Sequence, residues 1–322
     1  MPRTTAQLKE DNLHALKTAL KRLSVASKGE LSAETGLSPA SCNTLINELA
    51  RSGEILCLPA RRANEMGRPT RLYQINEEFQ KVLCLFPERL EARPFLHAVV
   101  YNLAGSLTAE EKTVWESESL ETLFQFTDKL LAAHPQIGAI GISVQGVVKK
   151  DGKIVACDAK PLAGLNLKAK LQERFHLPVV CENDMNLVAY GLMLKKALGR
   201  EASIAVLAKY SAVPSGAGLI VDGHFLRGST DFAGEVSFLP TPDSSPFSLT
   251  LYQLLSLITV ANPACIALTG DQVTEDAVAQ LQKQIRRFIP AEHCPRLTLL
   301  KTPFLYARQG LFALCLKELE HE

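Results

Sequence analysis

The sequence predicts an α/β protein of at least two domains, in which a helical N-terminal segment precedes alternating strands and helices. Its 322 residues exceed the length of one typical domain. From about residue 81 onward, short runs of aliphatic and β-branched residues alternate with segments whose apolar residues recur at helical spacing. A hydrophobic content of 47% and a charged content of 21% describe an ordinary soluble globular protein.

Basic residues concentrate near the N-terminus. Residues 1–76 contain eleven lysines and arginines against seven acids, a net charge of +4, whereas the whole chain carries +1. The remainder is therefore mildly acidic. A basic domain attached to an acidic body suggests a polyanionic partner that binds at one end only.

The first 76 residues predict three helices. Leucines at helical spacing indicate the first one: Leu13, Leu16, Leu20 and Leu23. Ser27 and Glu30 form a capping box for a short second helix, which we expect to end at Gly36 in a left-handed cap. Ser38 is placed to cap a third helix, with Pro39 at its first position, where the missing N–H is harmless.

Two helices joined by a glycine turn, with a polar face on the second, are typical of a helix-turn-helix domain that binds DNA. Short polar residues of the third helix could enter a major groove and reach base edges or phosphates. These candidates are Ser38, Ser41, Asn43, Thr44 and Asn47. Strand-like runs at 55–58 and 71–75 follow, so the segment between them is predicted to be the wing of a winged helix.

The predicted wing is rich in arginine. Its candidate DNA contacts are Arg61, Arg62, Gly67, Arg68 and Arg71. Gly67 permits a close backbone approach and Pro69 extends the chain, so Arg68 could insert into a narrow minor groove. A solvated basic loop is the alternative, and the helix-turn-helix pattern directly upstream favours DNA contact.

A second candidate site lies in the stretch 178–186. Four apolar residues predict a short buried strand that runs into Glu182, Asn183 and Asp184, before a helical segment. Polar side chains at the carboxyl end of a strand lie where open α/β sheets bind ligands. The alternative is that Asp184 only caps the helix, a position that favours Asp and Asn.

Eight cysteines are scattered without a CxxC pair, which indicates buried free thiols and a reducing compartment. No signal peptide precedes the basic start, and no apolar run approaches the length of a membrane span. We therefore expect a cytoplasmic protein without a membrane partner.

Four segments in order resemble the ROK family, which groups repressors and sugar kinases on an actin-like, ribonuclease-H-like fold. Residues 140–148 resemble its IGIxxPGxVD segment, and residues 178–186 resemble PVxxENDANA. Residues 216–239 resemble the glycine-rich segment that ends in AGEIGH, and residues 262–270 resemble NPexIVLGG. The winged helix and its Gly-Arg-Pro tip are similar to those of the family's sugar-sensing repressors.

The resemblance implies a domain layout. It places a winged helix-turn-helix domain at 1–76, a first α/β lobe at 77–190 and a second at 191–304, with a final helix at 305–322 packed back on the first lobe. About 30 residues separate Glu235 from the strand near 264, far fewer than is usual for the family, so we expect a shortened second lobe.

Three departures from the family argue against phosphoryl transfer from ATP, although Asp184 aligns with the catalytic base of the kinases. The turn between the first two strands is predicted at 87–91, where carboxylates would repel phosphate. The phosphate loop GTGxGxG is replaced by residues 211–218, and the final Gly-Gly becomes Gly270-Asp271. We therefore expect no enzymatic activity and no cofactor.

The family's zinc site is also predicted to be missing. Ser237 is taken as the position of the family's histidine, and no cysteine lies between Cys181 and Cys265 to supply the cysteine cluster. Because closed structural zinc sites need four nitrogen or sulfur ligands, we expect no metal.

The sugar site implied by the resemblance keeps carboxylates and amides, which suit sugar hydroxyls because these both donate and accept hydrogen bonds. Its candidates are Asn183, Asp184, Glu235, Asn166 and Ser237. The alternative is that these residues only hold loops in place.

The resulting hypothesis is a homodimeric DNA-binding regulator of sugar-related genes, a repressor that binds double-stranded DNA and a sugar or sugar-phosphate effector between the lobes. Two alternatives stay open from the sequence. One is a sugar kinase with a DNA-binding appendage, and the other is a regulator controlled by a protein partner without a sugar ligand.

Overall fold

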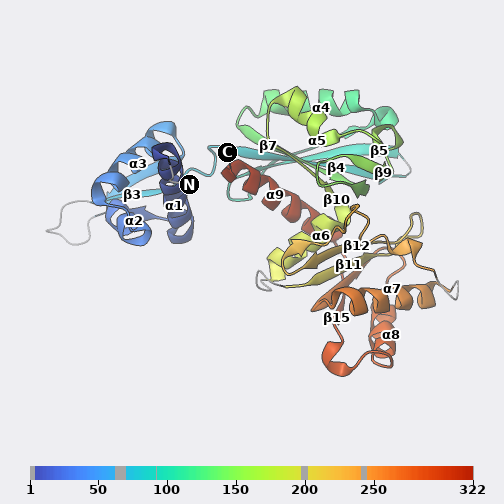
Figure 1. Cartoon of the computed structure of the whole chain (residues 1–322). Coiled ribbons are helices and arrows are strands. Elements are labelled where there is room, and N and C mark those ends of the chain that lie inside the picture. Colours follow the sequence, from blue (N-terminus) through green and yellow to red (C-terminus); the bar gives the residue numbers. More distant parts are fainter. Residues whose placement is uncertain (1–3, 62–69, 92, 197–201, 241–244, 322) are drawn as a thin grey trace. The chain divides into compact units, whose positions relative to one another are not determined.

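The computed structural model describes residues 4–61, 70–91, 93–196, 202–240 and 245–321. The chain divides into two compact units (Figure 1): Met1–Lys81 with Asn102–Ser106, and Val82–Tyr101 with Leu107–Glu322. Within the described residues, no helix is both long enough and apolar enough to cross a membrane.

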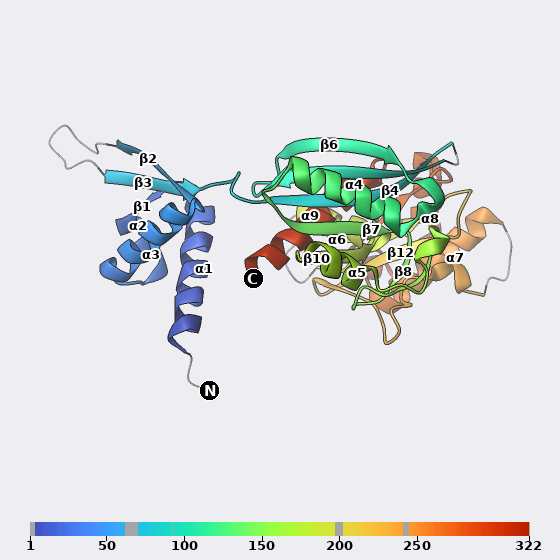
Figure 2. The same ribbon diagram turned by 90° about the horizontal axis from the view of Figure 1, so that it is seen from above.

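The first unit combines three helices with a small antiparallel sheet. Its elements are α1 (Thr5–Leu23), β1 (Ala26–Ser27), α2 (Lys28–Thr35), α3 (Pro39–Ser52), β2 (Ile55–Arg61) and β3 (Thr70–Ile75). The strand order is β1-β3-β2, and Figure 2 shows β2 and β3 side by side. Leu16, Leu20 and Ile46 are among the fully buried residues that join the helices in one core.

The predicted helix caps of this unit are confirmed. Ser27 accepts from the Glu30 N–H while the Glu30 side chain accepts from the Ser27 N–H, which completes the capping box. Gly36 adopts the left-handed conformation (φ 69°), and Ser38 caps α3 with Pro39 at its first position. Arg62, Gly67 and Arg68 of the predicted wing lie outside the described residues.

The second unit contains two α/β lobes, each built on a five-stranded sheet. The first lobe holds β4 (Lys81–Leu90), β5 (Arg93–Asn102), β6 (Leu107–Val114), α4 (Leu120–Ala133), β7 (Ile137–Val144), β8 (Gly146–Val148), β9 (Ile154–Cys157), α5 (Leu167–Phe175), β10 (Val179–Asn183) and α6 (Asp184–Lys196). The second lobe holds β11 (Ile204–Ala208), β12 (Gly216–Val221), β13 (His224–Phe225), α7 (Pro246–Ala261), β14 (Cys265–Thr269), α8 (Glu275–Ile285) and β15 (Arg296–Leu299). Helix α9 (Pro303–His321) follows and packs on α6, β7 and β10.

The two sheets repeat one topology. Their strand orders are β6-β5-β4-β7-β10 and β13-β12-β11-β14-β15, so the first strand of each lobe is central and the last lies at an edge. β10 runs parallel to β7, and β14 runs parallel to both β11 and β15. Parallel strands need crossover connections, which the helices supply. The mixed α/β fold expected from the sequence is confirmed.

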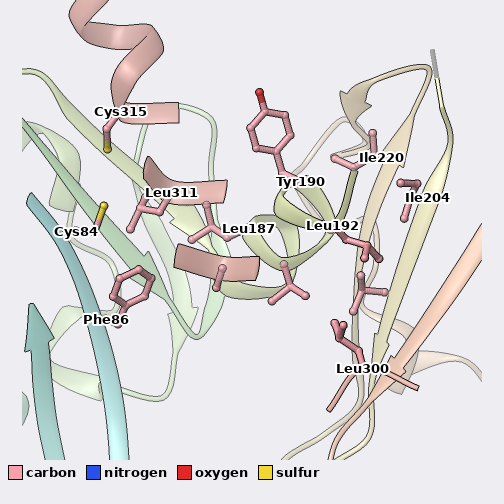
Figure 3. Close-up of a cluster of buried hydrophobic side chains, with 14 of the residues drawn as sticks. Cys84, Phe86, Leu187, Tyr190, Leu192, Ile204, Ile220, Leu300, Leu311 and Cys315 are labelled. Atoms are coloured by element: carbon pink, nitrogen blue, oxygen red, sulfur yellow. The ribbon is translucent and has the colours of Figure 1, made fainter. Parts of the chain in front are cut away.

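Helices α6 and α9 join the lobes through one continuous core (Figure 3). Cys84 and Phe86 come from the first sheet, Leu187 and Leu311 from the two helices, and Ile204 and others from the second sheet. The helices approach closely because glycines face backbone. A Cβ atom at Gly191 would lie 2.0 Å from the Tyr306 carbonyl oxygen, and one at Gly310 would lie 2.3 Å from the Leu187 oxygen.

One predicted boundary is wrong. The turn expected at 87–91 is largely strand, because β4 continues to Leu90 and β5 begins at Arg93. His97, which is buried, has its ring nitrogens 2.6 Å from the carboxylates of Glu88 and Glu110. These contacts link β4, β5 and β6, so the sheet extends past the apolar residues of β4.

Candidate functional site

A cleft of about 820 Å³ lies in the second unit, lined by residues of both lobes. The α/β rule predicts such a site, since ligands bind beyond the carboxyl ends of parallel strands. It brings together four of the five candidate sugar ligands: Asn183, Asp184, Glu235 and Ser237. Asn166 is not among the lining residues. Its side chain caps α5 by accepting from the Ala169 N–H at 2.9 Å.

At the start of α6, the sequence left open whether the polar residues cap the helix or line a ligand site, and the structure shows which residue makes the capping contact. Asn183 Oδ1 accepts from the Asn186 N–H at 2.9 Å, so Asn183 performs the capping contact, while its Nδ2 donates to the Gly146 carbonyl at 2.8 Å. Asp184 Oδ1 accepts from the Met185 N–H at 2.9 Å. Both side chains are thereby held at the wall of the cleft.

Asp184 lies in a strongly unfavourable environment for negative charge. Burial, reinforced by the negative charges of Asp158 and Glu235, raises the pKa of Asp184 to about 7. Burial also raises the pKa of Glu235. A carboxyl group that is partly protonated near neutral pH can both donate and accept hydrogen bonds, which matches the chemistry of a hydroxyl group.

We expect Asp184→Asn to stabilise the protein above pH 7. A folded-state pKa above the unfolded value means that the wild type loses stability as pH rises from about 4 through about 7. Three pKa units correspond to about 4 kcal/mol, and solvent contact in the cleft reduces this to about 2 kcal/mol at pH 8. Urea unfolding at pH 4.5 and pH 8 checks the result, with Asp151→Asn in an exposed turn as the matched control. An equal effect at both pH values would contradict it.

An ion pair between a buried glutamate and an arginine of the cleft lining stabilises the wall of the cleft. Glu182, only 3% exposed, forms a bidentate pair with Arg227, whose Nη1 lies 3.3 Å from Glu182 Oε1. The same Oε1 accepts from the Asn183 N–H at 2.9 Å and from Asn186 Nδ2 at 3.0 Å. The pair therefore fixes the strand end that carries Asn183 and links it to the β12–β13 side of the second lobe.

Two residues of the segment after β11 donate hydrogen bonds to partners within the protein. The Ser211 N–H and Oγ donate to the Asp271 carboxylate at 2.8 and 2.6 Å. The buried Lys209 donates from Nζ to Ser215 Oγ at 2.8 Å and to Gln253 Oε1 at 3.2 Å. Burial lowers the pKa of Lys209.

Counting the family motif GEIGH along residues 234–238 corrects one alignment. The histidine of that motif stands three residues after the glutamate, opposite Phe238 rather than Ser237. Phe238 is 72% exposed, lines the cleft and packs on Phe232 with a ring-centroid distance of 5.2 Å. Phe238 therefore adds an apolar ring to the lining of the cleft.

A separate polar surface lies on α3 in the first unit. The helix buries Cys42, Leu45, Ile46 and Leu49 and exposes its opposite face. The predicted DNA contacts on that helix and at its cap are all exposed: Ser38, Ser41, Asn43, Thr44 and Asn47.

Lys28 and the arginines of the hairpin add positive charge to this unit. Lys28 Nζ donates to Asn43 Oδ1 at 2.5 Å and to Asn47 Oδ1 at 2.6 Å. Because an ammonium group only donates, both amide NH₂ groups are turned away from it. Arg61 ends β2, and Arg71 is exposed on β3.

Sequence reasoning did not single out Asp158, Arg227 or Lys209. Asp158 and Arg227 line the cleft, and Lys209 lies beneath the loop that borders it. The available signal for the ion pair was an arginine directly before Gly228, at the end of the predicted hairpin. Asp158 carried no local signal, because a single aspartate after a strand is common in loops.

Comparison with known proteins shows what this chain resembles. Residues 96–247 match the model of the ROK family. Among curated proteins, the chain is 26% identical over 239 residues to the xylose repressor of Bacillus subtilis (strain 168), covering 72% of this chain and 60% of the relative. It is 29% identical over 160 residues to a glucokinase of Halalkalibacterium halodurans, covering 48% of each. The chain spans about three fifths of the length of the xylose repressors that it matches.

Among solved structures, the chain is similar to a ROK family transcriptional regulator described as a homolog of the E. coli MLC protein. The TM-score is 0.67 at 16% identity, and the match covers 97% of this chain and 99% of that chain. At this identity the likeness shows a shared fold and nothing more specific.

Proposed function

We propose that this protein is a sugar-responsive transcriptional repressor. Its first unit would be a winged helix-turn-helix domain that binds double-stranded DNA, and its second unit would bind the effector. The observation that carries the proposal is the exposed polar face of α3, which follows the left-handed turn at Gly36 and precedes the β2–β3 hairpin. The xylose repressors among its relatives support the same reading.

The effector site of this proposal is the cleft. Asp184, Glu235 and Asn183 present carboxyl and amide groups to it, and Ser237 adds a hydroxyl. A sugar that binds one arrangement of the lobes more tightly than another would shift the protein toward that arrangement and change DNA affinity. A homodimer that reads paired half-sites is part of the proposal.

The direct test is DNA binding with and without sugar. Fragments selected by the protein from genomic DNA would be titrated in a gel-shift assay, alone and with xylose, glucose or N-acetylglucosamine. We expect at least one sugar to change the affinity about tenfold, a coupling of about 1.4 kcal/mol. Failure to select any DNA would overturn the DNA-binding half, and insensitivity to every sugar would overturn the effector half.

Removing two amides from α3 should weaken DNA binding without unfolding the first unit. We expect Asn43→Ala with Asn47→Ala to lower affinity tenfold or more, since a good base contact contributes about 1–3 kcal/mol. Both residues are exposed, so the core of the helix is unaffected. Gel-shift titration and circular dichroism check this, and Asn12→Ala on α1 is the matched control. Unchanged affinity in the double variant would remove these residues from the interface.

The proposed DNA contact of Arg68 in the wing rests on the sequence alone and can be tested by substitution. Arg68→Ala should weaken binding to operators with an A·T-rich flank more than to G·C-rich ones, because the narrow minor groove attracts guanidinium groups. Competition between two such operators in a gel-shift assay measures the ratio. Equal losses on both would indicate phosphate contact only.

The alternative function is a sugar kinase, because one of the relatives is a glucokinase. The proposed absence of this activity rests on the loop after β11. Its Pro214 lacks an N–H, and Ser211 donates to Asp271. A coupled assay for ADP release with the same three sugars is therefore expected to show no ADP.

The proposal also includes a domain layout for the body of the chain. It has a first lobe at 77–190 and a shortened second lobe at 191–304, and the segment 305–322 packs back on the first lobe.

A further inference from the structure

The cleft is larger than a single sugar ring requires. Its volume of about 820 Å³ lies in the upper part of the range of about 300–1,000 Å³ that pockets for drug-sized ligands occupy. A monosaccharide held by Asp184 and Glu235 would leave much of this space to water. The other lining residues therefore indicate which further chemical groups the ligand has besides the sugar ring.

The charges that line the cleft disfavour an anionic ligand. Among the described residues, six acids line it: Glu88, Asp158, Asp184, Asp231, Glu235 and Asp271. The two arginines that line it are already paired, Arg89 with Glu118 and Arg227 with Glu182. No lysine of the described residues lines the cleft. A phosphate group would enter a field of its own sign.

The groups that could have held a phosphate are occupied from within the protein. Asp271 already accepts from the N–H and the hydroxyl of Ser211, as an anion bound by the loop would. Lys209 turns its ammonium inward to Ser215 and Gln253. Pro214 contributes no N–H to the loop. The Ser211 N–H and the Lys209 ammonium therefore already have partners within the protein, and residue 214 has no N–H to offer a phosphate.

Apolar side chains are exposed in the same cleft. Leu90 is 50% exposed, Val213 is 42% exposed and Phe238 is 72% exposed, and they come from three different segments. Phe304 also lines the cleft. Large apolar side chains that line one concave site favour an apolar ligand group, which removes their surface from water.

We propose that the cleft binds an uncharged glycoside, with the sugar ring at Asp184 and Glu235 and an apolar aglycone against Leu90, Val213 and Phe238, and that it rejects sugar phosphates. The inference rests on the proposed effector function and narrows its ligand class. The apolar substituent would occupy the space beside the loop after β11. Burial of one aromatic ring there should improve affinity at least tenfold over the free sugar.

Calorimetry on the full chain tests the proposal with three ligands for each of xylose, glucose and N-acetylglucosamine: the free sugar, its 4-nitrophenyl β-glycoside and its phosphate ester. For the sugar that binds, the nitrophenyl glycoside should bind at least tenfold more tightly, and the phosphate ester at least tenfold more weakly, than the free sugar. 4-Nitrophenol alone should give no measurable heat.

A protein variant distinguishes binding of the apolar group from binding of the sugar ring. Val213→Asp should reduce affinity for the glycoside at least fivefold more than affinity for the free sugar, while Val260→Asp on the exposed side of α7 should change neither. Free sugar binding as tightly as its glycoside would overturn this inference and leave the proposed function standing. Tight binding of the phosphate ester would overturn it as well. No heat from any of the nine ligands would overturn the effector function itself.

Discussion

Gly191→Ala should destabilise the second unit by about 3 kcal/mol, even though alanine is the better helix former by about 1 kcal/mol. The new Cβ would lie 2.0 Å from the Tyr306 carbonyl oxygen, which belongs to the backbone of α9 and cannot rotate away. The two helices must separate, and the core that joins the lobes through Leu187 and Leu311 would loosen.

Urea unfolding followed by circular dichroism measures this effect. Gly216→Ala is the matched control in the same unit, because a Cβ there meets nothing within 4 Å. If both variants unfold at the same urea concentration as the wild type, the close approach of α6 and α9 is wrong.

Arg227→Met should cost about 3 kcal/mol near neutral pH, because it leaves the Glu182 carboxylate buried without its cation. The loss should shrink as pH falls. An unpaired buried carboxyl has a raised pKa, so protonation at low pH removes the penalty. Unfolding midpoints at pH 5 and pH 8 give the comparison.

The double variant Glu182→Gln with Arg227→Met tests the cause. It should be more stable than Arg227→Met alone, since no charge then remains buried. An additive loss in the double variant would mean that Arg227 acts through packing, for example over the Phe225 ring, whose centroid lies 5.0 Å from its guanidinium carbon.

Local signals in the sequence predicted local structure well. The capping box at Ser27 and Glu30 and the left-handed Gly36 depend on neighbours within a few residues, and both are confirmed. Strand β6 was missed because its residues, Leu107–Val114, alternate weakly and carry charge on an edge strand. An edge strand needs less apolar surface, so its pattern is weaker than that of β7.

The candidate site was only partly predictable, because its parts lie far apart in the chain. The motif around Asn183 and Asp184 has a strand-to-helix pattern that can be read directly. The partner of Glu182 lies 45 residues away at Arg227, and the negative charge that raises the pKa of Asp184 comes from Asp158 and Glu235. Such pairings arise from the topology of two sheets, which single-residue patterns do not contain.

The position of helix α9 in the sequence affects when the second unit can fold during synthesis. This helix follows every other element in chain order, yet it covers α6, β7 and β10 of the first lobe. Until the ribosome has released α9, Leu187 and Cys84 lack the neighbours Leu311 and Cys315 that complete their packing. The N-terminal unit, whose own core is complete by residue 75, can fold while translation continues. The larger unit cannot complete its core until α9 has been synthesised.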